Sequence, residues 1–576
     1  MAVMTGDDVA PISLTGAKAF RGNLTKTRIR WVIAGLVGIF CIVGGRLVQL
    51  GMVVQDTSIE GRSQAEISAS RPAILDRNGL EMAVDIRVPS LYAEPRRIID
   101  VDDAVEKLRT VLPDLDPKWL RNKLSGDKGF VWIKRDLTPD IEDKIYQLGI
   151  PGLDFLTESK RFYPGGPEAS HILGSVNVDN KGIGGVEQYM DGTGLAQLQS
   201  VGLATRGQDL APVQLSIDMR VQHVMREMLL DALNRYHAHA AAAVMLDVRT
   251  GEVIGLSSVP DFDPNDPSSM IAPYNGEPRM RFNRITAGKY ELGSTFKTIT
   301  IAGALDSGLV KMTDHFDARF GVRFGRFTID DFHGQHRILS LPEVYKYSSN
   351  IGAIHIEQQW GKDNFRAFMT KIGLDDPLPI ELPEKTTSYI PKTLSEVTAA
   401  TAAFGHGISI TPLHMAAAMA AFVNDGVYEP PTIYRRTPEQ VKALARRFIS
   451  PQTSLEIREL MRLNALEGSG TVMDRQAQGY RVGGKTGTAE KVEQGRYSKS
   501  KDFNVFASAF PLDDPKYAMV VIIDEPHREG PTTGTTAGWN AGKTTGMIIA
   551  GVAPMLGIAP NFSRAIDDQL VPPSIR

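Results

Sequence analysis

The chain has 576 residues, of which 42% are hydrophobic and 23% charged, and a formal net charge of -3. This length exceeds what a single hydrophobic core usually serves, so two or more folded units are expected. The near-neutral charge offers no basic surface, and a nucleic-acid partner is not expected. The single cysteine, Cys41, excludes a disulfide framework, a zinc ribbon and an iron-sulfur cluster within one chain.

An apolar segment near the N-terminus predicts a membrane anchor. Residues 31–54 are long enough, at about 1.5 Å per residue, to cross a hydrocarbon core of about 30 Å. Basic residues precede the segment and charges of both signs follow it, which places the tail at 1–30 in the cytoplasm and the rest of the chain in the periplasm. No small-x-small cleavage site follows, so we expect an uncleaved, single-pass anchor in the cytoplasmic (inner) membrane. A buried soluble helix is the alternative.

One face of the expected anchor carries small residues. The stripe consists of Ala34, Gly38, Cys41, Gly45 and Gln49, with Arg46 beside it. Small residues let another helix approach closely, and a polar side chain can form a hydrogen bond across such an interface. The stripe therefore predicts an integral-membrane partner. The alternative is that glycines are simply common in membrane-spanning helices.

The segment 55–215 mixes short strands and helices without a repeat or a recognisable catalytic motif. Residues 72–75 and 80–88 predict a hairpin with Asn78-Gly79 in its turn. We interpret this segment as an N-terminal domain of its own.

After residue 215 the pattern changes to a helix over 219–236 and two strands on either side of Thr250-Gly251. The boundary is therefore placed near residue 215. One large domain is predicted over 216–560, followed by a loose C-terminal tail over 561–576.

The first candidate for chemistry is Ser294-Thr295-Phe296-Lys297, which opens an apolar run that predicts a helix to about Leu305. At this spacing Ser294 and Lys297 share one helix face, so the amine can reach the hydroxyl. The pattern alone is weak, because Ser125 to Lys128 and Ser498 to Lys501 also match it. Neither of these opens an apolar helix.

Two further motifs follow in order, Ser348-Ser349-Asn350 and Lys485-Thr486-Gly487. The order S-x-x-K, S-x-N, K-T-G is typical of penicillin-recognising serine enzymes. A serine hydroxyl is a poor nucleophile until a base takes its proton, and Lys297 can act as that base only if its pKa falls. Partial burial and the second cation, Lys485, would both lower that pKa.

The K-T-G motif also completes G-x-x-x-x-G-K-T at residues 479–486, the pattern of a phosphate-binding loop. Such a loop needs a buried strand before it and a helix directly after it, whereas Gly487 follows here. An exported domain also lacks a supply of ATP. We therefore predict an edge strand over 482–489 that lines a cleft.

With these motifs the chain resembles the class B penicillin-binding proteins, and within them the septal cell-division transpeptidases. The resemblance covers most of residues 25–560 and includes the segments 71–79 (RPAILDRNG), 184–187 (GGVE), 215–218 (LSID) and 407–412 (GISITP). It implies an α+β fold in which an antiparallel sheet is flanked by helices, as in serine β-lactamases and D,D-peptidases. It also implies an N-terminal α+β pedestal of the dimerisation type and one transmembrane helix.

The resemblance has two departures. Leu292 replaces the usual proline before Gly-Ser, and Phe404-Gly405-His406-Gly407 replaces an aromatic-rich Tyr-Gly-x-Gly. The second departure alters a wall of the donor site and bears on β-lactam preference.

The resemblance implies a role for each motif residue. Ser294 attacks the carbonyl of the penultimate D-Ala of a peptidoglycan stem, Lys297 accepts its proton, and terminal D-Ala leaves. Ser348 relays a proton to the leaving amine, and Asn350 holds the substrate amide and Lys297. The strand Lys485-Thr486-Gly487-Thr488 binds the terminal carboxylate. Backbone N–H groups of Ser294 and Thr488 form the oxyanion hole.

The resemblance also implies the partners: peptidoglycan stem peptides, β-lactams, a membrane-embedded glycan polymerase of the FtsW kind at the transmembrane helix, and other divisome proteins. It implies no metal or organic cofactor, and we interpret Asp331, His333 and His336 as a solvated polar loop rather than a zinc site.

The alternative functions are an elongation-type transpeptidase, a serine β-lactamase and a non-catalytic scaffold. The anchor and N-terminal domain argue against the β-lactamase, and the intact motifs argue against the scaffold.

Overall fold

The computed structural model describes residues 31–44 except 32 and 42, residues 70–195, residues 210–572 except 267, 270–281 and 494–495, and residue 575. The chain divides into two units, Met1–Glu66 and Ile67–Arg576. The described residues between 31 and 44 are helical. Among the described residues no helix is both long and apolar enough to span a bilayer. Much of the anchor predicted over 31–54 lies outside the described residues.

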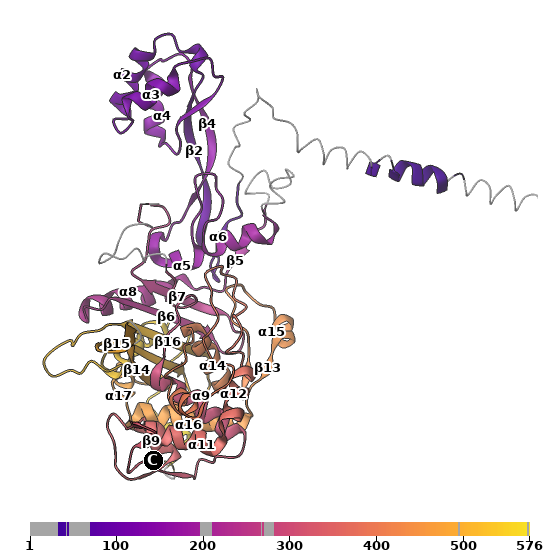
Figure 1. The fold of residues 1–576 in the computed structure, drawn as a ribbon. Coiled ribbons are helices and arrows are strands. Elements are labelled where there is room, and N and C mark those ends of the chain that lie inside the picture. Colours follow the sequence, from indigo (N-terminus) through magenta and orange to yellow (C-terminus); the bar gives the residue numbers. More distant parts are fainter. Residues whose placement is uncertain are drawn as a thin grey trace, which may run out of the picture. The chain divides into compact units, whose positions relative to one another are not determined.

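The N-terminal part of the second unit is built on a long hairpin (Figure 1). Its strand β2 (Glu81–Ala93) pairs antiparallel with β4 (Leu153–Phe162) and, near its end, with β3 (Val131–Lys134). The helices around one end of the hairpin are α2 (Val101–Val111), α3 (Pro117–Leu124) and α4 (Pro139–Gln147). These elements share a small hydrophobic core.

The other end of the hairpin carries the predicted turn. Strand β1 (Ile74–Leu75) pairs antiparallel with β2 and parallel with β5 (Val213–Gln214). Between β1 and β2, the Asp76 carboxylate accepts hydrogen bonds from the N–H groups of Asn78 and Leu80, at 2.7 and 2.8 Å. The hairpin predicted with Asn-Gly in its turn is confirmed, although its second strand extends well beyond residue 88.

A buried ion-pair network joins the segments 71–79 and 184–187. Arg71 pairs with Glu187 at 2.7 Å, and both side chains are 0% exposed. Arg161 pairs with the other oxygen of Glu187 at 2.7 Å and with Asp85 at 3.0 Å. Glu187 lies on the short helix α6 (Gly185–Met190), so the network ties that helix to the hairpin.

The C-terminal part is built on a five-stranded antiparallel sheet. Its order is β14 (Gly483–Glu493), β15 (Arg496–Phe510), β16 (Tyr517–Asp524), β6 (Ala240–Asp247) and β7 (Val253–Val259). The predicted strands on either side of Thr250-Gly251 are thus β6 and β7, and the predicted helix before them is α8 (Met219–Arg235).

Helices cover both faces of this sheet. Alternate residues of β6 enter different cores: Ala242 and Val244 pack in one, Ala241 and Ala243 in the other. The first core also receives α14 (Pro412–Val423) and α16 (Pro451–Glu467), and the second receives α8 and α18 (Lys543–Val552). The fold is therefore α+β, with an antiparallel sheet between helical layers, and the pedestal adds a sheet of mixed direction.

The remaining elements complete the C-terminal part. Short paired strands are β8 (His315–Asp317) with β11 (Ile338–Ser340), β9 (Val322–Phe324) with β10 (Phe327–Ile329), and β12 (Val427–Tyr428) with β13 (Arg446–Arg447). The other helices are α10 (Leu341–Lys346), α11 (Asn350–Trp360), α12 (Lys362–Lys371), α13 (Glu396–Ala402), α15 (Pro438–Leu444), α17 (Thr471–Gln476) and α19 (Arg564–Leu570).

Within the described part of the C-terminal segment, helix α19 and Val571 pack against the domain. Asp567 of α19 pairs with Arg462 at 2.8 Å, and Val571 is fully buried. The expectation of a loose tail is therefore wrong for residues 564–571, because a buried arginine and an apolar contact fix them. The domain boundaries at residues 215 and 560 remain predictions.

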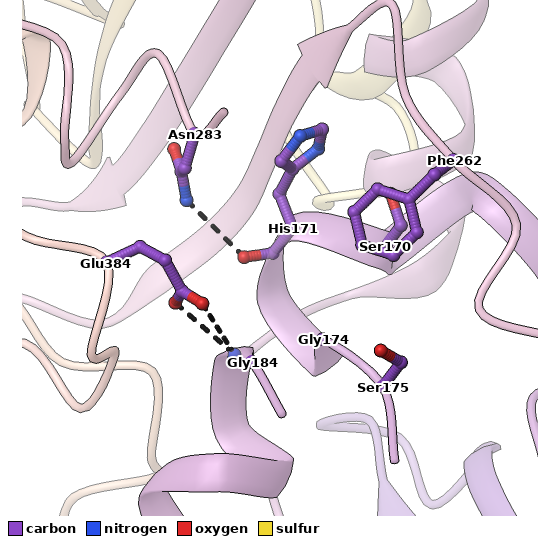
Figure 2. Close-up of a pocket in the computed structure, with 9 residues that line it drawn as sticks. Ser170, His171, Gly174, Ser175, Gly184, Phe262, Asn283 and Glu384 are labelled. Carbon is purple, nitrogen blue, oxygen red and sulfur yellow. Dashed lines mark hydrogen bonds between the residues drawn. The ribbon is translucent and has the colours of Figure 1, made fainter. Parts of the chain in front are cut away.

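Figure 2 shows where the pedestal meets the C-terminal part. The Glu384 carboxylate accepts a hydrogen bond from the N–H of Gly185, at 3.1 and 3.3 Å to its two oxygens. Asn283 Nδ2 donates to the carbonyl of His171 at 3.4 Å. Residues of both parts line a cavity of about 20 Å³, which has room for about one water molecule.

Candidate active site

Ser294 lies in a tight turn that leads directly into a helix. The turn η5 (Gly293–Phe296) is a 3-10 turn, and α9 (Lys297–Asp306) follows it. The helix predicted from Ser294 is confirmed, although its first turn is a 3-10 turn and the α-helix begins at Lys297. Lys297 is the first residue of α9 and is fully buried, whereas Ser294 on the preceding turn is part-exposed.

The first two motifs meet at Ser348. Lys297 Nζ donates hydrogen bonds to Ser348 O at 2.5 Å, to Ser348 Oγ at 3.2 Å and to Asn350 Oδ1 at 2.8 Å. These bonds go to Ser348 and Asn350 rather than to Ser294. Ser348 has a φ of +58°, a left-handed conformation that costs a residue other than glycine about 1–3 kcal/mol.

The third motif reaches the same serine. Lys485 Nζ donates to Ser348 Oγ at 2.9 Å, and the Lys485 side chain is fully buried. The structure therefore brings Lys297, Ser348, Asn350 and Lys485 into one hydrogen-bonded cluster, one turn from Ser294.

Burial and charge set the protonation of the two lysines. Burial lowers the pKa of Lys297 well below its ordinary value, the charge of Lys485 lowers it further, and Asp331 opposes the shift. Burial also lowers the pKa of Lys485, to about 7. Lys297 is therefore suited to hold a neutral amine near neutral pH, as a base requires.

The K-T-G motif lies on β14, at the edge of the sheet. The predicted edge strand is confirmed, and the phosphate-binding loop is excluded because a strand, not a helix, contains and follows Lys485-Thr486. A Cβ atom on Gly487 would lie 2.2 Å from the carbonyl oxygen of Leu292, so only glycine lets β14 approach η5 this closely. On the other side, Gly293 has a φ of +52° and its Cβ position lies 2.8 Å from the oxygen of Thr488.

The two threonines of β14 are held by residues that the sequence analysis did not single out. Thr486 Oγ1 shares a hydrogen bond of 2.6 Å with Ser469 Oγ. Thr488 Oγ1 accepts one of 3.1 Å from the N–H of Ala537. Neither contact has a spacing pattern that would reveal it in the sequence.

Asp331 is a further residue of the site. Its carboxylate accepts hydrogen bonds from the N–H groups of Asn350 at 2.5 Å and Ile351 at 3.0 Å, and from Ser349 Oγ at 2.7 Å. It therefore satisfies donors in the first turn of α11 and fixes Asn350. The expectation that Asp331 is a solvated loop residue is wrong. No group of three His, Cys, Asp or Glu suited to a metal is found among the described residues.

Glu291 joins the segment before the nucleophile to two other segments. Its carboxylate accepts a hydrogen bond from the N–H of Gly407 at 3.0 Å and from the hydroxyl of Tyr497 at 3.2 Å. His406 lies between these contacts, beside the rings of Phe404 and Tyr497, and burial lowers its pKa to about 4. His406, in the segment 404–407 that departs from the family pattern, therefore carries a neutral imidazole beside Phe404 and Tyr497.

The two other S-x-x-K matches are not serine–lysine pairs of this kind. Ser125 ends α3 on the surface of the pedestal. Ser498 and Lys501 lie on β15, where residues three apart point to opposite faces.

Family comparisons agree with this architecture. The model of the penicillin-binding protein transpeptidase domain matches residues 241–541, and that of the penicillin-binding protein dimerisation domain matches residues 66–199. Two solved structures share the fold. A peptidoglycan synthetase from Bifidobacterium adolescentis has a TM-score of 0.65 at 22% identity, and the match covers 86% of this chain and 97% of that one. Penicillin-binding protein 3 from Mycobacterium tuberculosis, complexed with aztreonam, has a TM-score of 0.63 at 21% identity, and the match covers 86% of this chain and 98% of that one.

Curated relatives are similar over nearly the whole chain. A protein of Caulobacter vibrioides named probable peptidoglycan D,D-transpeptidase FtsI is 35% identical, over 92% of this chain and 89% of its own length. The probable peptidoglycan D,D-transpeptidase PenA of Neisseria gonorrhoeae is 30% identical over 92% and 93%. Peptidoglycan D,D-transpeptidase FtsI of Escherichia coli is 29% identical over 90% and 89%. The chain belongs to the class B penicillin-binding proteins, with a dimerisation domain followed by a transpeptidase domain.

Proposed function

We propose that this protein is a peptidoglycan D,D-transpeptidase that cross-links stem peptides at the division septum through a serine acyl-enzyme and is inhibited covalently by β-lactams. The observation that carries the proposal is the hydrogen-bonded cluster of Lys297, Ser348, Asn350 and Lys485, in which Lys297 follows Ser294 by one turn. Relatives named FtsI and PenA support the reaction, and the name FtsI supports the role in division.

In the acylation half-reaction, neutral Lys297 takes the proton of Ser294 while the hydroxyl oxygen attacks the penultimate D-Ala carbonyl. The backbone N–H groups of Ser294 and Thr488 stabilise the resulting oxyanion, a contribution of about 3 kcal/mol per donor. Protonated Lys485, with Thr486 and Thr488, binds the terminal carboxylate. The C–N bond then breaks, and the proton reaches the departing D-Ala amine through Ser348, which bonds to both lysines.

Intact-mass analysis after treatment with penicillin tests the nucleophile. Wild type should gain one penicillin adduct, and Ser294→Ala should gain none. Ser125→Ala and Ser498→Ala are matched controls and should label like wild type. An adduct on the Ser294→Ala variant would refute the assignment.

The location and membrane partner are further parts of the proposal. The apolar segment 31–54 anchors the protein in the inner membrane, with residues 1–30 cytoplasmic and the catalytic domain periplasmic. Its small-residue stripe binds a membrane-embedded glycan polymerase of the FtsW kind, and other divisome proteins join this assembly.

Paired leucine substitutions test that contact. Gly38→Leu with Gly45→Leu should leave membrane insertion and penicillin labelling intact but weaken co-purification with the polymerase, because leucine prevents close helix approach. Ile39→Leu with Val43→Leu, on the side of the helix away from the stripe, is the control. Equal co-purification of both double variants and wild type would show that the helix only anchors the protein and does not bind the polymerase.

A further inference from the structure

A transpeptidase has to hold two stem peptides, and the Lys485-Thr486-Gly487-Thr488 strand serves only one of them. Lys485, Thr486 and Thr488 lie on β14 and, in the proposed reaction, bind the carboxylate of the donor. The second stem must bring an amine to the acyl-enzyme from another direction. The inference below rests on the proposed function and concerns where that second stem binds.

A cavity of about 550 Å³ adjoins the Ser348-Ser349-Asn350 motif. It lies between the segments 318–321 and 330–336 and the start of α11. Its lining includes Arg319, Phe320, Asp330, Asp331, His336 and Ile351. The volume falls within the range of about 300–1,000 Å³ that is usual for ligand sites.

Hydrogen bonds connect the wall of this cavity to the catalytic cluster. Asn350 Nδ2 donates to the carbonyl oxygen of Asp330 at 3.3 Å, and Asn350 Oδ1 accepts from Lys297 Nζ at 2.8 Å. The neighbouring wall residue Asp331 accepts from the N–H of Asn350 at 2.5 Å. A single residue, Asn350, therefore touches both the proposed base and the cavity wall.

The charges of the lining indicate what the cavity binds. Arg319 forms a bidentate ion pair with Asp317, at 2.9 and 2.7 Å, which neutralises its charge. The Asp331 carboxylate already accepts hydrogen bonds from residues at the start of α11. Within the described part of the chain, no donor forms a hydrogen bond with the Asp330 carboxylate. Phe320 beside it is 78% exposed, an apolar surface for a methylene chain. This combination suits an ammonium group at the end of an aliphatic side chain.

We propose that this cavity binds the acceptor stem peptide, with Asp330 pairing the side-chain ammonium group that becomes the cross-link. To react, the ammonium group releases one proton to solvent, and its nitrogen attacks the acyl carbonyl. The C–O bond to Ser294 breaks as the C–N bond forms. Lys297 takes the second proton from nitrogen and returns it to the Ser294 oxygen, so the enzyme is regenerated.

The test measures how the acyl-enzyme is divided between amine and water. A thioester analogue of the D-Ala-D-Ala terminus serves as donor, and a stem tripeptide with a free side-chain amine serves as acceptor. The ratio of aminolysis to hydrolysis products is independent of how fast each variant is acylated. Asp330→Asn should lower this ratio about tenfold, the effect of one charge-assisted hydrogen bond. Asp330→Lys should lower it further by repulsion.

Two more variants keep the result interpretable. Asp363→Asn, an exposed aspartate on α12 of the same domain, is the matched control and should keep the wild-type ratio. Gly321→Ala should lower the ratio without any change of charge, because the added Cβ would lie 2.1 Å from Asp330 Oδ1 and displace that carboxylate. Unchanged ratios in both Asp330 variants would overturn the acceptor site. Failure of wild type to form any acyl-enzyme would instead overturn the proposed function.

Discussion

At the scale of single residues, the site depends on two buried lysines with different tasks. Both bond to the hydroxyl of Ser348, and each loses the hydration that stabilises its charge. Their mutual repulsion favours one proton on the pair rather than two, and Asp331 limits the shift on Lys297. In the proposed mechanism, Lys297 then acts as the base while Lys485 binds the carboxylate.

Lys297→Arg should abolish acylation although it keeps the positive charge. A guanidinium with a pKa above about 12 cannot accept a proton near neutral pH. We expect the second-order rate of penicillin acylation to fall at least about a hundredfold, the lower end of the usual contribution of a general base. Lys501→Arg, in the unrelated S-x-x-K match, should be silent. Near-normal acylation of the Lys297→Arg variant would show that Lys297 is not the proton acceptor.

The pH dependence of kcat/KM for a donor with a free carboxylate should be bell-shaped. Activity rises as Lys297, whose pKa is lowered by burial and by Lys485, loses its proton. It falls as Lys485 loses its proton, with a pKa of about 7, because the carboxylate then lacks its cation. A donor with an amidated C-terminus should react more slowly and lack the alkaline limb. A rate that still rises toward about pH 10 would indicate an ordinary lysine pKa.

At the scale of elements, the active site is a contact between an edge strand and a helix start. β14 can approach η5 because Gly487 and Gly293 have no side chains at the point of contact. The third side of the site is α11, whose first turn is held by Asp331 and by Ser349, the N-cap residue. The motif spacing therefore reflects three elements that meet at one point.

Gly487→Ala should separate β14 from η5 without unfolding the sheet. The new Cβ would lie 2.2 Å from the Leu292 oxygen, so the strand has to shift, and Thr488 moves away from the oxyanion position. We expect penicillin acylation to fall at least about tenfold, with little change in the thermal midpoint. Gly530→Ala, where the added Cβ meets nothing within 4 Å, is the control. Equal acylation of both variants would contradict the close-contact argument.

At the scale of the whole molecule, the pedestal is held by buried charges rather than by one large core. Glu187 compensates Arg71 and Arg161, and all three side chains are fully buried. Such a network constrains which segments meet, because each charge needs its partner. The segments 71–79 and 184–187 are thereby joined.

Glu187→Gln should destabilise the pedestal by about 3 kcal/mol, because Arg71 and Arg161 lose the fully buried carboxylate that they share and keep only the less buried Asp191 and Asp85. Thermal unfolding of the purified protein measures the loss. Asp103→Asn, which removes an exposed partner of Lys107, should change the midpoint little. A Glu187→Gln variant as stable as wild type would show that the network does not stabilise the fold.

The sequence by itself predicted the elements that local patterns specify. Period and turn residues indicated the β1–β2 hairpin, helix α8, strands β6 and β7, and the edge strand with Lys485. The ordered motifs predicted which residues carry the chemistry. These features depend on neighbours in the chain or on a fixed order of residue types, so they are visible without coordinates.

Only the tertiary structure decided which distant residues complete the site. Asp331, Ser469 and Ala537 reach motif residues through contacts that no spacing encodes, and α19 packs through Asp567 although its segment looked loose. The shape of the cavity beside Asn350 likewise arises from segments that are adjacent only after folding. Such contacts depend on how strands and helices pack. Sequence periodicity reports which face of an element is buried, but not which residue lies opposite it.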